Sequence, residues 1–138
     1  MSHSIRELFY HLIWSTKNRE PLINNDNKGL LSKFIIEKAL TLRCKIFAFN
    51  CVCDHVHLLL YIPPNLAVSM AINGFKGYSS HEMGKYSQDF GWQQGYSIFT
   101  LRRTELPIVE AYIKNQEQHH LDNTFDPLWE SPTDSDIM

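Results

Sequence analysis

Hydrophobic and polar residues repeat with two different periods along this chain, and the changes of period predict its strands and helices. Aromatic and branched residues fill 8–16, which predicts a strand, and the polar stretch 17–25, which contains Pro21, predicts a loop. Apolar residues at helical spacing follow. They predict a helix that begins at Asn25 or Asp26 and ends near Arg43.

Two apolar runs in the middle of the chain predict a hairpin. Residues 45–52 and 55–62 are both typical of strands, and one strand of their combined length would be unusually long. A turn is therefore expected at Cys53 and Asp54. Pro63 ends the second of these strands, because proline cannot donate a hydrogen bond to a neighbouring strand.

The second half of the chain predicts a helix, a strand and a last helix. The first helix runs from Val68 to about Tyr86, although three glycines lower its helix propensity. The strand covers Trp92 to Leu101. The last helix runs from about Glu105 to His120, with Thr104 as its cap.

This order, β-α-β-β-α-β followed by one more helix, predicts an α+β fold. The first six elements match the ferredoxin-like pattern, in which an antiparallel sheet carries two helices on one face. The last helix is additional to that pattern, and additional elements on common folds often carry function. We expect a single domain over 1–138, with a loop-rich tail over about 122–138.

The net charge limits how this protein contacts nucleic acid. The formal charge is −2 and the isoelectric point is near 6.4, so any phosphate contact needs a local basic patch. For each basic residue a solvated surface charge is the simpler interpretation. The candidates for DNA contact are Lys17, Arg19, Lys76, Arg102 and Arg103.

Apolar runs and cysteines indicate where the protein works. No apolar run approaches the ~18 residues of a membrane span, and the N-terminus lacks the apolar core of a signal peptide. The cysteines number three, and such an odd, sparse count fits a reducing compartment better than a disulfide framework. We expect a soluble cytoplasmic protein with no membrane partner.

His55 and His57 flank Val56 on a predicted strand. Side chains at positions i and i+2 of a strand point to the same face, ~7 Å apart along the chain. Two imidazoles placed in this way can bind one metal ion from the same side. The alternative interpretation is two unrelated polar side chains on an open sheet face.

Cys51 and Cys53 precede the two histidines and raise the question of a zinc site. Four alternate residues of one straight strand extend over ~20 Å, whereas tetrahedral zinc holds every ligand within ~2.3 Å. A turn at Asp54 relieves only part of this separation. We favour the interpretation of both cysteines as small buried hydrophobic residues.

Tyr112 and Gln116 lie four positions apart on the last predicted helix, and His119 and His120 follow about one turn later. The spacing of four places both side chains on one helical face. Tyr112 is a candidate nucleophile, and a core or rim aromatic is the alternative. Histidines at a helix end often only balance the helix dipole.

Five motifs occur in a fixed order along the chain. They are His11-Leu12-Ile13-Trp14-Ser15-Thr16-Lys17-x-Arg19-x-Pro21, Asp54-His55-Val56-His57-Leu58-Leu59-Leu60, Lys76-Gly77-x-Ser79-Ser80, Trp92-x-x-Gly95-Tyr96 and Tyr112-Ile113-x-x-Gln116-x-x-His119-His120. Together they resemble the insertion-sequence-200-like transposases, the TnpA type of HUH single-tyrosine enzymes, in which HUH stands for His-hydrophobic-His. The resemblance covers about residues 9–125, and the tail from Asp126 to Glu130 departs from the family pattern.

This resemblance implies a DNA transposase. His55, His57 and Gln116 would be metal ligands, and Tyr112 would attack a phosphodiester to give a 5′-phosphotyrosine and a free 3′-OH. The metal would be Mg²⁺ or Mn²⁺, and a mixed nitrogen and oxygen ligand set suits Mn²⁺ better. A phenol, whose pKa is near 10, needs such activation to attack at neutral pH.

The resemblance also implies partners. Members of the family are homodimers that act on single-stranded ends of insertion sequences and recognise nearby hairpins. The tyrosine helix would lie against the partner's histidines, so that each site is shared. The short connection 102–104 also allows that helix to dock on its own domain.

Other functions fit parts of the sequence. One is a domesticated relative that processes repeated hairpins of a host genome, and another is a structural zinc protein. A third is a non-catalytic RNA-binding module, in which Trp14, Trp92 and Tyr96 would stack on bases instead of packing in the core. The His-Val-His motif occupies the strand on which such a module would carry its aromatic residues.

Overall fold

The computed structural model describes residues 4–116 of the chain. The predicted tail, together with His119 and His120, lies outside the described residues. The helices and strands are β1 (Phe9–Ser15), α1 (Lys28–Leu42), β2 (Lys45–Val52), β3 (His55–Tyr61), α2 (Val68–Gly84), β4 (Ser97–Leu101) and α3 (Leu106–Lys114), with short 3-10 turns η1 (Lys17–Arg19) and η2 (Arg103–Glu105). Within this range no helix has the length and apolar character needed to cross a membrane.

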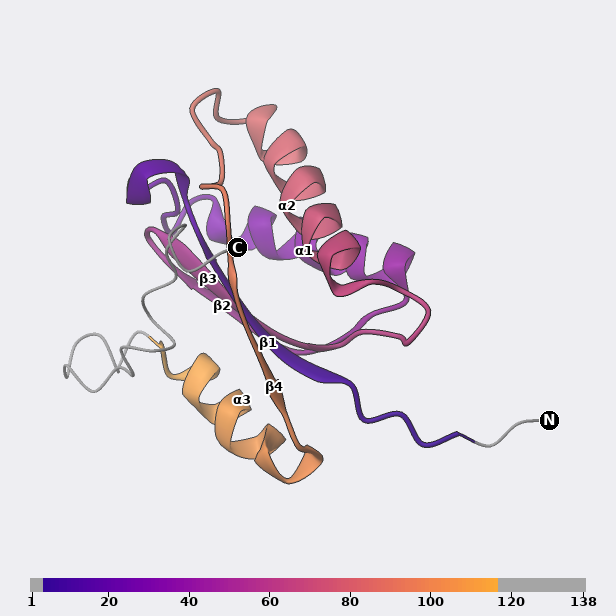
Figure 1. The fold of residues 1–138 in the computed structure, drawn as a ribbon. Helices are drawn as coiled ribbons and strands as arrows, with labels where there is room; N and C mark the ends of the chain where they lie inside the picture. Colours follow the sequence, from indigo (N-terminus) through magenta and orange to yellow (C-terminus); the bar gives the residue numbers. More distant parts are fainter. Residues whose placement is uncertain (1–3, 117–138) are drawn as a thin grey trace.

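The strands form one antiparallel sheet in the order β2-β3-β1-β4. This is the ferredoxin-like order that the sequence predicts, with two split βαβ units interleaved. The helices α1 and α2 cover one face of the sheet, and α3 lies against the other face (Figure 1). The α+β fold with an additional last helix is therefore confirmed.

The larger core lies between the sheet and the pair α1 and α2. Every second residue of the central strands points into it, among them Leu12 and Trp14 on β1 and Leu58 on β3, and all three are fully buried. The helices contribute apolar residues such as Phe34 and Phe75. This alternation is the two-residue period that predicts the strands.

The smaller core lies on the opposite face of the sheet, under α3. Leu106, Val109 and Ile113 recur at helical spacing along α3 and pack on the sheet residues Phe9 and Leu59. The central strand β3 is therefore buried on both faces, and its burial pattern is almost continuous. Polar side chains on its second face are held between the sheet and α3.

Several boundaries differ from the sequence prediction: α1 begins at Lys28, with Asn27 as its N-cap instead of Asn25 or Asp26, and α3 ends at Lys114 instead of continuing to about His120. The fourth strand begins at Ser97 instead of Trp92, and Trp92 makes only an isolated bridge with Thr16. The cause is Gly95, whose φ of 97° turns the chain out of the extended conformation. Thr104 lies inside the turn η2 and does not cap α3, which begins after Glu105.

The predicted turn at Cys53 and Asp54 is confirmed, because β2 and β3 form a hairpin around these two residues. Cys51 pairs with Val56 across the hairpin and packs in the larger core, whereas His55 and His57 alternate with Val56 and face α3. The sheet therefore separates Cys51 from the histidines. A zinc site that joins all of these residues is excluded. The prediction that both cysteines are buried is confirmed for Cys51 and is wrong for Cys53, which lies in the hairpin turn and is exposed.

Candidate active site

The His-Val-His pair lies on the central strand β3, on the face that α3 covers. His55 is 1% exposed and His57 is fully buried, and their ring centroids are 5.2 Å apart. The shared face follows from the two-residue spacing, as the sequence predicts. The burial shows that the face is not an open polar surface.

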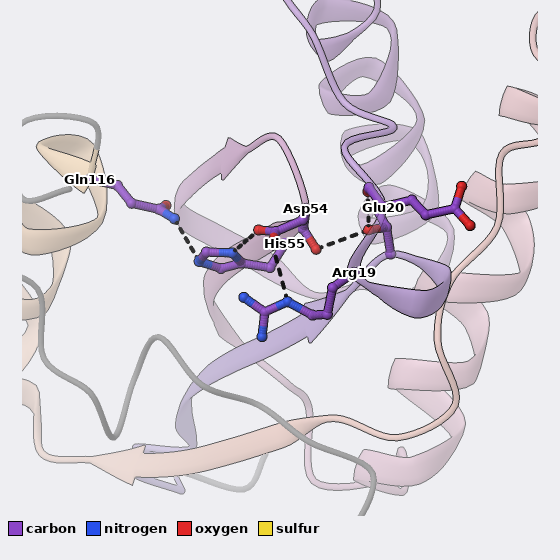
Figure 2. Close-up of polar contacts among 6 residues, drawn as sticks. Arg19, Glu20, Asp54, His55 and Gln116 are labelled. Carbon is purple, nitrogen blue, oxygen red and sulfur yellow. Dashed lines mark hydrogen bonds and ion pairs between the residues drawn. The ribbon is translucent and has the colours of Figure 1, made fainter. Parts of the chain in front are cut away.

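The helix α3 brings the two other candidate residues to this pair. The amide nitrogen of Gln116, which lies just beyond α3, is 3.2 Å from His55 Nε2 (Figure 2). The ring of Tyr112 is centred 6.1 Å from the ring of His57, and the tyrosine is only partly buried. Side chains four positions apart thus reach two histidines that are two positions apart on a strand. All four belong to one chain.

Asn50 fixes the end of α3 over the histidines. Its side-chain amide donates a 2.9 Å hydrogen bond to the carbonyl oxygen of Ile113, at the C-terminal end of α3. Asn50 is paired with His57 in the register of β2 and β3, so it stands beside the candidate site. The last carbonyl groups of a helix lack partners within the helix, and Asn50 supplies one. Sequence reasoning did not single out this residue.

A series of hydrogen bonds connects His55 with Asp54, in the turn before it, and with Arg19. The Nδ1 atom of His55 is 2.8 Å from an oxygen of Asp54, and the other oxygen of Asp54 accepts a 3.3 Å hydrogen bond from Arg19 (Figure 2). The hydrogen bond with His55 lowers the pKa of the Asp54 carboxyl group below its usual value, and the charge of Arg19 adds to this effect against partial burial. Asp54 is therefore a carboxylate at neutral pH.

The loop that carries Arg19 is held in an unusual conformation. Asn18 and Arg19 both have φ of 56°, in the left-handed region. The hydroxyl of Thr16 donates to the carbonyl of Glu20 at 2.6 Å, and the backbone nitrogen of Thr16 donates to the carbonyl of Asp54 at 2.8 Å. These bonds tie the loop to the hairpin turn and set the guanidinium group beside the candidate site.

The donor atoms fit a divalent metal. Because Asp54 accepts the Nδ1 proton of His55, the lone pair of His55 is on Nε2 and points at Gln116. Among the described residues, Gln116 Oε1 is a buried oxygen with no hydrogen-bond partner. A half-turn of the amide, which leaves its shape unchanged, brings this oxygen to His55 Nε2, where a shared cation would satisfy both atoms.

No group of three His, Cys, Asp or Glu side chains within residues 4–116 is arranged to hold a metal ion. Within this range the amide of Gln116 is the candidate third donor beside His55 and His57, because it lies 3.2 Å from His55 and its oxygen is buried without a partner. Water and phosphate oxygens would complete its coordination, as is usual where a protein supplies few ligands.

The candidate DNA-contact residues fall into two groups. Exposed Lys17 and partly exposed Arg19 lie on η1, directly after the strand position that pairs with His55. Arg102 and Arg103 follow β4 at the opposite end of the sheet, where Arg103 donates a 2.9 Å hydrogen bond to Glu7. The structure thus brings Arg19 to the candidate site through Asp54, whereas Lys17 lines a hollow beside Gln88 and Asp89 and the arginines after β4 lie away from the site. A DNA contact stays a prediction for all four.

Lys76 joins two of the sequence motifs to each other. Its ammonium group donates to the carbonyl oxygens of Gln93 and Gly95 at 2.8 and 2.9 Å. Nearby, the indole nitrogen of Trp92 donates to the hydroxyl of Ser79 at 2.9 Å. The Lys-Gly-x-Ser-Ser motif therefore anchors the Trp-x-x-Gly-Tyr segment on α2, and a DNA contact by Lys76 stays a prediction.

The α+β fold and the order of the motifs place the chain among transposases with a ferredoxin-like sheet. The sequence model of the family described as Transposase IS200 like matches residues 4–116, and the chain belongs to this family. The chain is 27% identical over 124 residues to the transposase for insertion sequence element IS200 of Salmonella typhimurium, covering 84% of this chain and 81% of that protein. It is 26% identical over 120 residues to the ISDra2 transposase TnpA of Deinococcus radiodurans, covering 81% and 86% of the two chains.

Solved structures support the fold. A crystal structure of a candidate transposase from Deinococcus radiodurans superposes with a TM-score of 0.69 at 24% identity, over 84% of this chain and 95% of that one. A REP-associated tyrosine transposase bound to a REP hairpin superposes with a TM-score of 0.68 at 17% identity, over 87% of this chain and 72% of the other.

Proposed function

We propose that this transposase cleaves and rejoins single-stranded DNA at the ends of an insertion sequence, with Tyr112 as nucleophile. The observation that carries the proposal is the meeting of Tyr112 and Gln116 with the buried pair His55 and His57 on one face of the sheet. A partly exposed phenol beside two imidazoles is where a phosphodiester would have to be placed for this reaction.

In the proposed step, the Tyr112 oxygen attacks the phosphorus atom of one phosphodiester. The bond from phosphorus to the 3′ oxygen breaks, the phenol loses its proton, and the leaving oxygen gains one to become a free 3′-OH. The DNA 5′ end stays on Tyr112 as a phosphotyrosine. Because the new bond is also a phosphodiester, a 3′-OH can reverse the attack without an energy source.

His55, His57 and Gln116 would hold Mg²⁺ or Mn²⁺ at this site, through the two imidazole nitrogens and the amide oxygen. Such an ion, when bound, polarises a phosphoryl oxygen and stabilises developing negative charge. The role of the chain is positional. Asp54 fixes the ring of His55, and Asn50 fixes the helix that carries the nucleophile. Arg19, which lies at the edge of the site, is a candidate contact for the DNA phosphate.

A single-stranded substrate with a subterminal hairpin fits the family membership. The REP-associated neighbour is bound to a hairpin, and we extend this class of ligand to the present chain as part of the proposal. The same neighbour favours a second candidate function, a domesticated enzyme that processes repeated genomic hairpins. Both functions use the same chemistry and differ in the DNA that flanks the gene.

We further propose a homodimer in which each chain builds its own site. The sequence hypothesis of a shared site places the tyrosine helix on the partner, whereas here α3 packs on the sheet of its own chain through Leu106, Val109 and Ile113. Mixing Tyr112→Phe and His57→Ala proteins under exchange conditions tests this. Sites within one chain predict no recovery of cleavage. Recovery with confirmed heterodimers means that the helices are exchanged.

The activity is tested with a labelled single-stranded insertion-sequence end, incubated with Mn²⁺ and resolved on a denaturing gel. The proposal predicts cleavage of the single strand and little cleavage of the same sequence as a duplex, because pairing removes both the hairpin and the unpaired site. Equal cleavage of both forms, or cleavage by Tyr112→Phe protein, contradicts the proposal.

A further inference from the structure

His11 is a third histidine at the candidate site, and the proposed reaction does not use it. It lies on β1, is 1% exposed, and its Nε2 atom is 2.8 Å from Nδ1 of His57. Its ring is 5.1 Å from that of His57 and 6.1 Å from that of Phe99, measured between centroids. His11 is therefore fixed between the central strand β3 and the edge strand β4.

The contact between His11 and His57 constrains the position of one proton. Two ring nitrogens 2.8 Å apart share a single proton, so one ring donates and the other accepts. If His11 donated, a neutral His57 would carry its own proton on Nε2, and that nitrogen could not bind a cation. If His57 donates from Nδ1, its Nε2 carries no proton, and the lone pair of that nitrogen can bind a cation. Only the second arrangement is compatible with His57 as a ligand.

We propose that His11 is a positioning residue that accepts the Nδ1 proton of His57 and so directs the Nε2 lone pair of His57 to the metal. This inference rests on the proposed function, because it concerns the proposed metal ligand. His11 acts for His57 as Asp54 does for His55, whose Nδ1 is 2.8 Å from a carboxylate oxygen. Each histidine of the pair thus has its own partner on Nδ1, one from the neighbouring strand and one from the preceding turn.

His11 does not act as a further ligand in this account. Its Nε2 atom, the one that faces the site, is engaged by His57. The residue therefore acts through His57, and its loss should weaken metal binding without removing a coordinating atom.

The first test measures the tautomers directly. In metal-free, ¹⁵N-histidine-labelled protein, ring nitrogen shifts distinguish a proton on Nδ1 from one on Nε2, and His57→Gln protein assigns the His57 signals. The inference predicts that His57 is protonated on Nδ1. Protonation on Nε2 in the metal-free protein overturns it, whether or not the protein cleaves DNA.

The second test measures Mn²⁺ affinity by calorimetry on the full chain. His11→Phe keeps an aromatic ring but cannot accept a proton, and it should weaken Mn²⁺ binding roughly 10–100-fold, as losses of such supporting contacts do. His11→Gln offers an amide oxygen near the position of Nε2 and should restore most of the affinity. His81→Phe makes the same change at an exposed histidine of α2 and should leave the affinity unchanged.

The outcomes separate this inference from the proposed function. If wild-type protein binds Mn²⁺ and folded His11→Phe protein binds it equally well, the positioning role is wrong and the metal site stands. If His11→Phe protein does not fold, the test rests on His11→Gln. Folded His11→Gln protein that binds Mn²⁺ far more weakly than the wild type overturns the positioning role, because its amide oxygen can accept the same proton. If wild-type protein binds no Mn²⁺, the metal site itself is wrong and the role of His11 falls with it.

Discussion

Replacing Ile113 by alanine should release α3 from the sheet without unfolding the rest of the protein. Ile113 is fully buried in the smaller core with Leu106 and Val109, whereas the larger core lies on the other face of the sheet. The three side chains contribute roughly 1.5–3 kcal/mol each through burial. Ordering the 9 residues of the helix opposes this gain, at about 1–2 kcal/mol per residue before its own hydrogen bonds are counted.

The docking of α3 is therefore only marginally stable, and Ile113→Ala should weaken it by about 2–5 kcal/mol. Each 1.36 kcal/mol is about a factor of ten in population, so we expect cleavage to fall at least about tenfold. Ile108→Ala is the matched control, because Ile108 is on the same helix and 68% exposed. Its effect on stability should stay within about 0.5 kcal/mol.

Hydrogen exchange of the α3 amides and the rate of strand cleavage measure the two consequences. Ile113→Ala should lose protection in α3 while β1 and β3 keep theirs, and Ile108→Ala should match the wild type in both assays. Equal protection of α3 in the two variants, or global unfolding of Ile113→Ala, would refute the view of α3 as a separately docked element.

Four further changes have defined outcomes. Tyr112→Phe removes one hydroxyl, so it should abolish cleavage on a denaturing gel and retain hairpin binding in a mobility-shift assay. His57→Ala should lower Mn²⁺ affinity and cleavage together, with partial recovery at high Mn²⁺ in a titration; unchanged cleavage in the presence of chelator would oppose this. Gly77→Ala should raise the free energy of unfolding by about 0.5–1 kcal/mol in a urea titration, because alanine favours helix and a methyl group there meets no heavy atom within 4 Å outside the adjacent backbone of its own helix. In native protein at pH 8, iodoacetamide should modify exposed Cys53 far faster than Cys44, whose pKa burial raises to about 11; equal labelling by mass spectrometry would contradict the burial.

The sequence predicts most of the fold because its periods are regular. The second strand, Lys45–Val52, has the predicted limits, since apolar and turn residues mark both ends. The fourth strand begins later than predicted because the chain turns at Gly95, and the ammonium group of Lys76 binds the carbonyl groups of Gln93 and Gly95, so that Trp92 makes only an isolated bridge. That contact joins residues far apart in sequence, and no local pattern contains it.

The candidate site is predicted in part. The spacing of His55 and His57, and that of Tyr112 and Gln116, predicts that each pair shares a face, but only the docking of α3 brings the two pairs together. The sequence motifs include His11 but assign it no role, because one histidine in an apolar strand is not informative by itself. The informative feature is the position of His11 in the strand. It lies two residues before Ile13, which pairs with His57 in the sheet, and this spacing places its side chain on the same face as the histidine pair.

The identity of the nucleophile is tested most directly by mapping the covalent product. The protein is incubated with a single-stranded insertion-sequence end and Mn²⁺, digested with trypsin and nuclease, and analysed by tandem mass spectrometry. The account predicts a nucleotide 5′-phosphate on Tyr112 and on no other residue, with no adduct in Tyr112→Phe protein. Active cleavage with an adduct on another tyrosine, or with no adduct at all, would contradict it.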